Sequence, residues 1–155
     1  MSGSGIDTMT HLDELRSFSA RAGADPLLVQ GPGGNTSIKT GDIMWVKASG
    51  TWLRDALDKD VFVPVDWQAV RRGLAENDPA CESSVAFVRN ELNELKLRPS
   101  IETAVHALMP QPVVVHVHCV NTISWAIRED AESVLAERLE GQDWAFIPYV
   151  RPGLP

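Results

Sequence analysis

The sequence lacks the features that mark several classes of protein. Its 155 residues carry 14 Lys and Arg against 21 Asp and Glu, so no basic surplus exists and no nucleic-acid partner is expected. No apolar run approaches the ~20 residues of a membrane span, which predicts no membrane association. The first residues, MSGSGIDTMT, show no basic segment followed by an apolar one, so no secretory signal is expected.

Cysteine and tyrosine are also scarce. Cys81 and Cys119 do not make a disulfide framework, and a reducing cytoplasm is the simplest compartment for such a chain. Tyr149 is the only tyrosine, and the local sequence leaves open whether it packs in a core or acts as a phenolic acid. The length fits one domain with a sizeable core.

The most apolar stretch is VVVHVHCVNT, residues 113–122. Residues 113–120 contain no Gly, Pro or charge and are rich in β-branched side chains, which predicts a buried strand. Alternation along a strand places His116 and His118 on one face, opposite to Cys119. Two neutral imidazoles on one face can begin a metal site. The alternative is a pair of histidines along a polar rim of the sheet.

The remaining pattern mixes helices and strands without a regular βαβ order, which favours a sheet covered by helices. The predicted helices span 12–22, 66–76, 82–96, 101–109 and 131–140, and the other predicted strands span 43–47, 61–65 and 144–150. Asp66 and Ser100 are the expected N-caps of the second and fourth helices. Pro64 places the strand at 61–65 at a sheet edge or at a strand end.

A glycine-rich segment, GPGGNTS at residues 31–37, matches neither a Walker A loop nor GxGxxG. Its glycines still allow backbone N–H groups to turn toward an anion, and Asn35 and Ser37 add side-chain donors. Ser49 and Gly50 repeat this combination after a predicted strand. On local evidence alone, an ordinary turn is the preferred explanation of each segment.

Glu102 lies in the first turn of the helix that Ser100 is expected to cap. A glutamate there can complement the helix dipole, worth roughly 0.3–1 kcal/mol, or it can act as an acid/base. His106 follows at i+4 on the same helix face. Its apolar neighbours favour a satisfied, partly buried histidine over a metal ligand.

Five segments, taken in order, resemble the class II aldolase/adducin family: GGNTS, KASGT, RPSIETAVH, VVVHVHC and FIPYVRPGLP. The resemblance runs from about residue 12 to the last residue and is strongest to zinc-dependent sugar-phosphate aldolases. It implies a three-layer α/β/α fold with a central mixed, largely antiparallel sheet, in one domain over 1–155. The family's third zinc histidine has no counterpart after His118, a pattern that resembles an N-terminal part of the family's domain.

The resemblance also implies roles for individual residues. His116 and His118 would bind a divalent metal, expected to be zinc, and Glu102 would be the catalytic acid/base, for which a raised pKa is expected. Tyr149 resembles a tyrosine that reaches a neighbouring subunit's site and protonates the departing aldehyde. The phosphate-binding residues would be Gly34, Asn35, Ser37, Ser49, Gly50 and Ser100.

The implied function is metal-dependent aldol cleavage of a phosphorylated sugar by a cytoplasmic homo-oligomer, a tetramer in the family. Ile101 departs from the family pattern, because the aldolases often have a second phosphate-binding serine there. The alternative is an adducin-like domain that keeps the fold for assembly without catalysis. Intact Glu102, His116 and His118 favour the enzyme lineage.

Overall fold

The structure is a computed structural model that describes residues 4–150. Its helices and strands are α1 (Ser4–Ala24), β1 (Asn35–Thr40), β2 (Ile43–Lys47), β3 (Phe62–Asp66), α2 (Trp67–Ala75), α3 (Thr103–Leu108), β4 (Val113–His116), α4 (Val120–Ala126) and α5 (Ala131–Arg138). Four short 3-10 helices complete it: η1 (Leu53–Asp55), η2 (Pro79–Glu82), η3 (Val85–Phe87) and η4 (Asn90–Leu92).

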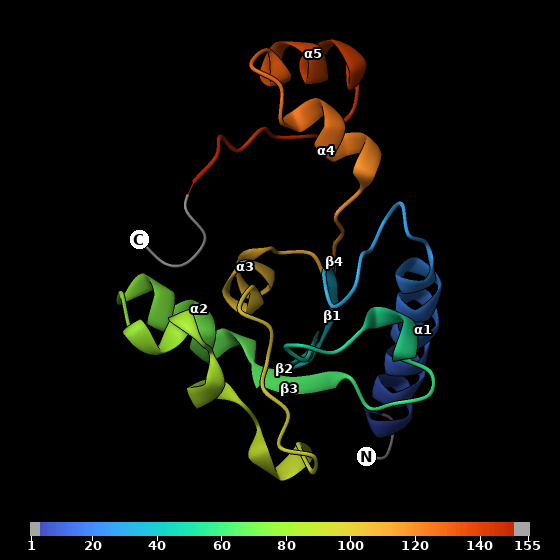
Figure 1. The fold of residues 1–155 in the computed structure, drawn as a ribbon. Helices are drawn as coiled ribbons and strands as arrows, with labels where there is room; N and C mark the ends of the chain where they lie inside the picture. Colours follow the sequence, from blue (N-terminus) through green and yellow to red (C-terminus); the bar gives the residue numbers. More distant parts are fainter. Residues whose placement is uncertain (1–3, 151–155) are drawn as a thin grey trace.

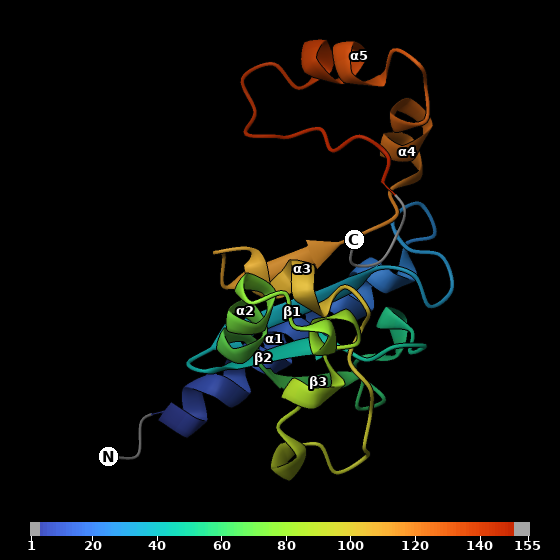
Figure 2. The same ribbon diagram turned by 90° about the vertical axis from the view of Figure 1, so that its left-hand side faces the viewer.

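The described strands form one sheet in the order β3-β2-β1-β4, and every neighbouring pair is antiparallel. Helix α1 covers one face of this sheet, and α2 and α3 cover the other (Figures 1 and 2). The predicted three-layer α/β/α arrangement around a largely antiparallel sheet is therefore confirmed.

Strand alternation divides the core between the two faces of the sheet. On β2, Met44 and Val46 point toward α2 and α3, whereas Trp45 points toward α1. The core under α2 and α3 contains Met44, Val46, Ala48, Val63, Val65, Val70, Val88, Ala104 and Ala107. The core under α1 contains Leu12, Leu15, Ala20, Ile38, Ala56, Val61 and Phe62.

Two local predictions about β3 and α2 are confirmed. The Asp66 side chain accepts a hydrogen bond of 2.8 Å from the backbone N–H of Ala69, which caps α2. Pro64 lies on β3, an edge strand, where its missing N–H removes no hydrogen bond between neighbouring strands.

The predicted helix at 82–96 is wrong. That segment forms η3, η4 and turns, and Ser84 and Lys96 have left-handed backbones with φ of 54° and 51°. The Arg89 N–H donates a hydrogen bond to the carbonyl of Pro64, and Val88 forms an isolated β-bridge with Val65. The segment therefore contacts the outer edge of β3. The helical spacing of its apolar residues was misleading because only Val88 of the expected face is buried.

The histidine strand is shorter and less buried than predicted, since Val113 and Val115 are exposed. β4 ends at His116, because the N–H groups of His118 and Val120 bond to the carbonyls of Leu28 and Leu27 instead of continuing along β1. α4, which begins at Val120, was not predicted. The strand β1 was also missed, because it begins inside the glycine-rich segment.

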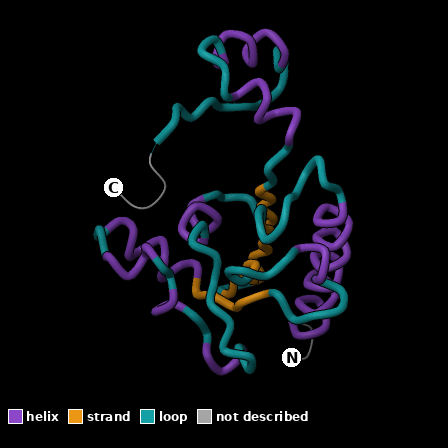
Figure 3. The backbone as a smooth tube through the Cα atoms, in the orientation of Figure 1, coloured by secondary structure: helices purple, strands orange, loops and turns teal. Residues whose placement is uncertain are grey.

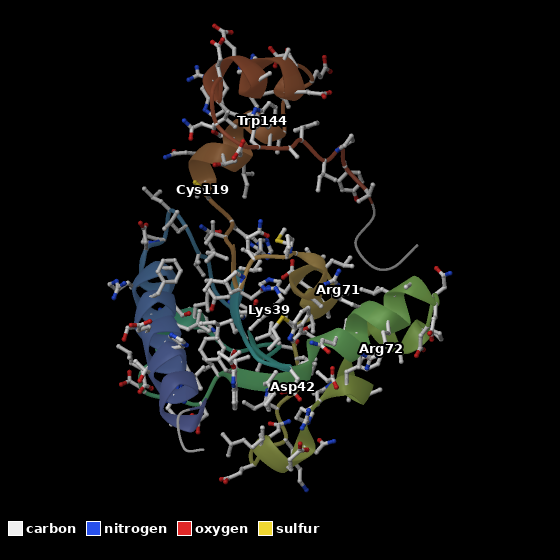
Figure 4. All side chains as sticks on the ribbon, turned by 180° about the vertical axis from the view of Figure 1, so that it is seen from behind. Lys39, Asp42, Arg71, Arg72, Cys119 and Trp144 are labelled. Carbon is white, nitrogen blue, oxygen red and sulfur yellow. The ribbon has the colours of Figure 1, made fainter. Side chains whose placement is uncertain are left out.

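The strand expected at 144–150 is wrong as well. All seven residues are described, and they run as a loop after α5 (Figure 3). α4 and α5 extend away from the sheet beyond the end of β4 (Figure 1). Cys119 marks the junction, and Trp144 lies with these helices (Figure 4). Among the helices of residues 4–150, none has the length and apolarity needed to cross a bilayer.

The core under α2 and α3 yields a first prediction. Met44 is 0% exposed in this core, so Met44→Ala should lower the free energy of unfolding by about 2–5 kcal/mol through lost burial and a cavity. Met9→Ala is the matched control, because Met9 is 62% exposed and should change stability little. Urea unfolding measures both, and equal effects would contradict this description of the core.

Candidate active site

Asn35, Glu102 and His116 lie together at one end of the β1–β4 pair. Asn35 and His116 are direct partners in the register of the two antiparallel strands, which places their side chains on one face. Glu102, in the turn before α3, closes over them: its Oε2 lies 3.0 Å from His116 Nδ1 and accepts a hydrogen bond from Asn35 Nδ2. These three residues come from segments that lie far apart in the sequence, and the fold brings them together.

The carboxylate of Glu102 does not cap its own helix. It occupies the N-cap position of α3 without a side-chain capping bond, and it is turned to Asn35 and His116 instead. The hydrogen bond from His116 lowers the pKa of Glu102, and burial, which acts in the opposite direction, is the smaller effect. The raised pKa that we expected is therefore not what this arrangement gives.

His118 lies beside His116, although it follows the end of β4. The two ring centroids are 4.9 Å apart. This spacing allows one ion to contact both rings, since Zn–N bonds are about 2.0–2.1 Å long. The donor chemistry of the pair thus fits a divalent ion. Within residues 4–150, however, no group of three or more His, Cys, Asp or Glu side chains is arranged to hold a metal.

Three segments of the expected phosphate site converge next to this cluster. The Ser100 hydroxyl lies 3.3 Å from Asn35 Nδ2, and the Ser100 N–H bonds to the carbonyl of Lys47. Ser49 and Gly50, in the turn after β2, are exposed. Asn35 Oδ1 is buried and has no hydrogen-bond partner among the described residues.

Lys47 is a residue of this region that the sequence analysis missed. It is 3% exposed at the end of β2, and its Nζ donates to the carbonyls of Pro32 and Thr51 at 2.8 and 2.7 Å. A lysine inside the apolar strand IMWVK, next to a small-residue turn, was the signal that could have identified it. Burial lowers its pKa, and the Glu102 carboxylate partly opposes this.

Ser37 lies apart from the exposed turn at Ser49. Its side chain is fully buried, and its hydroxyl lies 2.7 Å from Nδ1 of His106. His106 is 1% exposed, and its Nε2 has no partner in the described part of the chain. Burial lowers the pKa of His106 to about 4, so the ring is neutral near pH 7.

Tyr149 is the expected site residue that lies farthest from the described cluster along the chain. It is 89% exposed in the loop after α5, and its proposed role toward a neighbouring subunit stays a prediction. Glu102, His106 and His116 line a shared groove together with Val105, Met109 and Val114. This groove gives a small molecule access to the acid/base candidate.

The fold agrees with the comparisons with known proteins. The family described as the class II aldolase and adducin N-terminal domain matches residues 19–155. The chain belongs to this family. The N-terminal class II aldolase domain of a conserved protein from Thermoplasma acidophilum is similar in structure, with a TM-score of 0.72 and 27% identity, over 92% of this chain and 70% of that one.

A relative in sequence is the uncharacterized oxidoreductase YuxG of Bacillus subtilis (strain 168), 31% identical over 152 residues. The match covers 92% of this class II aldolase/adducin chain but only 22% of YuxG. The chain therefore spans about a fifth of that relative's length, and the activity in YuxG's name describes a much longer protein.

The buried His106 generates a second prediction. Its pKa falls from 6.5 in the unfolded chain to about 4 in the folded protein, so the unfolded state binds more protons between these values. Stability should therefore fall with decreasing pH through this window, by about 2–3 kcal/mol between about pH 7 and about 4.5. His106→Asn should be less stable at neutral pH but should lose less stability on acidification. Urea unfolding at several pH values measures this, and parallel curves for parent and variant would contradict it.

Proposed function

We propose that this chain is the metal-binding and phosphate-binding part of a sugar-phosphate lyase that catalyses aldol cleavage. The observation that carries the proposal is the cluster of Glu102, His116 and Asn35, with a carboxylate 3.0 Å from an imidazole in an accessible groove. Membership in the class II aldolase/adducin family supports the reaction class. It also supports a homo-oligomer, with a tetramer as the expectation, and we propose a cytoplasmic location.

In this proposal Glu102 moves the proton on the reacting carbon. When a C–C bond β to a carbonyl breaks, the β-hydroxyl gives up its proton as the aldehyde forms, the electron pair of the C–C bond passes to the ketone half, and the resulting enediolate carbon must take up a proton. Glu102 would deliver that proton, and in the reverse direction its ionised form would remove it. The lowered pKa keeps Glu102 ionised near neutral pH, which is the form needed for removal.

His116 and His118 are the residues that would hold a divalent ion, for which zinc is the expectation. A bound ion would supply Lewis-acid stabilisation to the carbonyl and hydroxyl oxygens of the substrate. This pair supplies two imidazoles, fewer than the three protein ligands typical of catalytic zinc, and Glu102 is the neighbouring carboxylate. We therefore expect weak, reversible metal binding.

The anion site orients the other end of the substrate. Gly34 and Gly50 would offer backbone N–H groups, and Asn35, Ser49 and Ser100 their side chains. Holding the phosphate would fix the distance between the reacting carbon and Glu102. This positioning is how phosphate binding would raise the reaction rate. Ser37 would act behind this surface, because its hydroxyl is bonded to the buried His106.

Metal binding gives the third prediction. The 155-residue protein should retain little metal after dialysis against a chelator and should bind added Co²⁺ or Zn²⁺ reversibly. His116→Ala and His118→Ala should each abolish this binding, whereas His106→Ala should leave it unchanged because His106 is buried against Ser37. Elemental analysis and Co²⁺ absorption titrations measure the effect. One tightly held metal per chain would contradict the two-histidine site.

The role of Glu102 gives the fourth prediction. In the presence of Co²⁺, the protein should catalyse exchange of a carbon-bound hydrogen of dihydroxyacetone phosphate with deuterium from solvent, followed by NMR. Glu102→Gln should slow the exchange at least ~10²-fold, the usual scale for a general base. Glu94→Gln, which changes an exposed glutamate, is the matched control. If the parent protein folds without metal and shows no hydrogen exchange even with Co²⁺, the result would favour the non-catalytic, adducin-like alternative.

A further inference from the structure

A cavity of about 400 Å³ lies on the face of the sheet that α1 covers. Its walls come from α1, β2, the start of β3 and the segment 91–97. This segment includes the end of η4, which lies at the same end of the molecule as the start of α1 (Figures 1 and 2). The sheet separates the cavity from the candidate active site, because Trp45 in its wall faces α1 whereas Asn35 and Ser37 face the side of α3. The volume of the cavity is in the range of small-molecule sites.

Two buried N–H donors at this cavity have no acceptor. Nε1 of Trp45 and Nε of Arg16 belong to side chains that line the cavity, and neither atom has a hydrogen-bond partner among the described residues. The Arg16 guanidinium is held in place by Asp60, because its Nη2 donates to that carboxylate. Buried donors are nearly always bonded to a protein group or to ordered water. The two donors therefore indicate an acceptor that the described chain does not supply.

Apolar side chains line the same cavity and are exposed. Met9 and Leu95 are each 62% exposed, and Leu92 is 43% exposed, whereas Phe62 is buried. Leu92 and Leu95 are two of the residues whose spacing predicted a helix over 82–96. Instead of packing in a core, they form one wall of the cavity. An apolar wall opposite unmatched donors is the pattern of a ligand pocket.

The charges around the cavity restrict what it can bind. Among the described lining residues, the carboxylates of Asp60, Glu91 and Glu94 outnumber the guanidinium of Arg16. An anionic ligand would add a negative charge to this set and would be repelled. An uncharged carbonyl oxygen avoids this cost, and its two lone pairs can accept from both donors.

We propose that this cavity binds a small uncharged molecule that has an aliphatic body and a carbonyl oxygen. The carbonyl accepts from Nε1 of Trp45 and Nε of Arg16, and the aliphatic body covers Leu92 and Leu95. The site is separate from the cluster of Glu102 and its partners, so it does not rest on the proposed lyase activity. Hexanamide is the probe, acetamide tests the need for an aliphatic body, and hexanoate tests the effect of charge.

The indole N–H resonance of Trp45 reports the proposed hydrogen bond directly. It is assigned by triple-resonance NMR, so no substitution is needed. Hexanamide should shift this resonance in a saturable way and leave that of Trp144, which lies with α4 and α5, in place (Figure 4). Acetamide should bind at least ~10-fold more weakly because it lacks most of the aliphatic body, and hexanoate at least ~5-fold more weakly because of its charge. An unshifted Trp45 resonance up to the solubility limit of hexanamide assigns the donors to buried water and overturns the proposal.

Substitutions in the apolar wall give a second test. Leu95→Ser should keep the fold because Leu95 is exposed, and it should weaken hexanamide binding at least ~3-fold through lost apolar contact. Ile127→Ser is the matched control, because Ile127 is 78% exposed and does not line the cavity, so it should leave the affinity unchanged. Trp45→Phe should weaken binding about fivefold, the usual scale for one hydrogen bond, measured by ligand-observed NMR.

Equal affinities of the parent and Leu95→Ser would overturn the proposal. Competition between hexanamide and Co²⁺ would also overturn it, because the probe would then lie at the histidines. Binding of hexanamide by a protein that shows neither Co²⁺ binding nor hydrogen exchange would leave this inference standing while the lyase proposal fails.

Discussion

The pairing of β1 with β4 is the constraint on which the candidate site depends. Its register makes Asn35 and His116 direct partners, so the glycine-rich segment before β1 and the histidines at the end of β4 meet at the same end of the sheet. A shift of one residue would turn Asn35 and His116 to opposite faces and separate them from Glu102. The shift would also expose Val114, the buried valine of β4.

Sequence patterns predicted the elements whose signals are local. Periodicity and capping residues predict three such elements, and the structure contains all of them: the strand at 43–47, the Asp66 cap and the helix ending before Gly141. The missed or wrong elements depend on distant partners. β1 is a strand because β2 and β4 flank it, and 82–96 is irregular because Val88 and Arg89 bond to the edge of β3. The expected site residues Glu102 and His116 meet for the same reason, through pairing that no local pattern encodes.

The ionisable side chains that lie at least half buried within this small region include those of Lys47, Glu102 and His106. Burial lowers the pKa of Lys47 and of His106, so each favours the neutral form more than it does in the unfolded chain. Glu102 is the exception, because the hydrogen bond from His116 outweighs burial and keeps it ionised. A carboxylate that is stabilised as an anion beside a buried ammonium is typical of a functional site rather than of a core.

Close packing explains the glycines before β1 in a way that neither interpretation of the sequence, an ordinary turn or an anion-binding loop, had included. Gly34 has a φ of +63°, and a Cβ there would lie 2.9 Å from the carbonyl oxygen of His116. At Gly33, a Cβ would lie 2.8 Å from Nδ1 of His118. Neither an ordinary turn nor an anion loop alone requires this close approach. The two glycines allow the histidine segment to pack directly against the start of β1, so they help to set the position of the imidazoles.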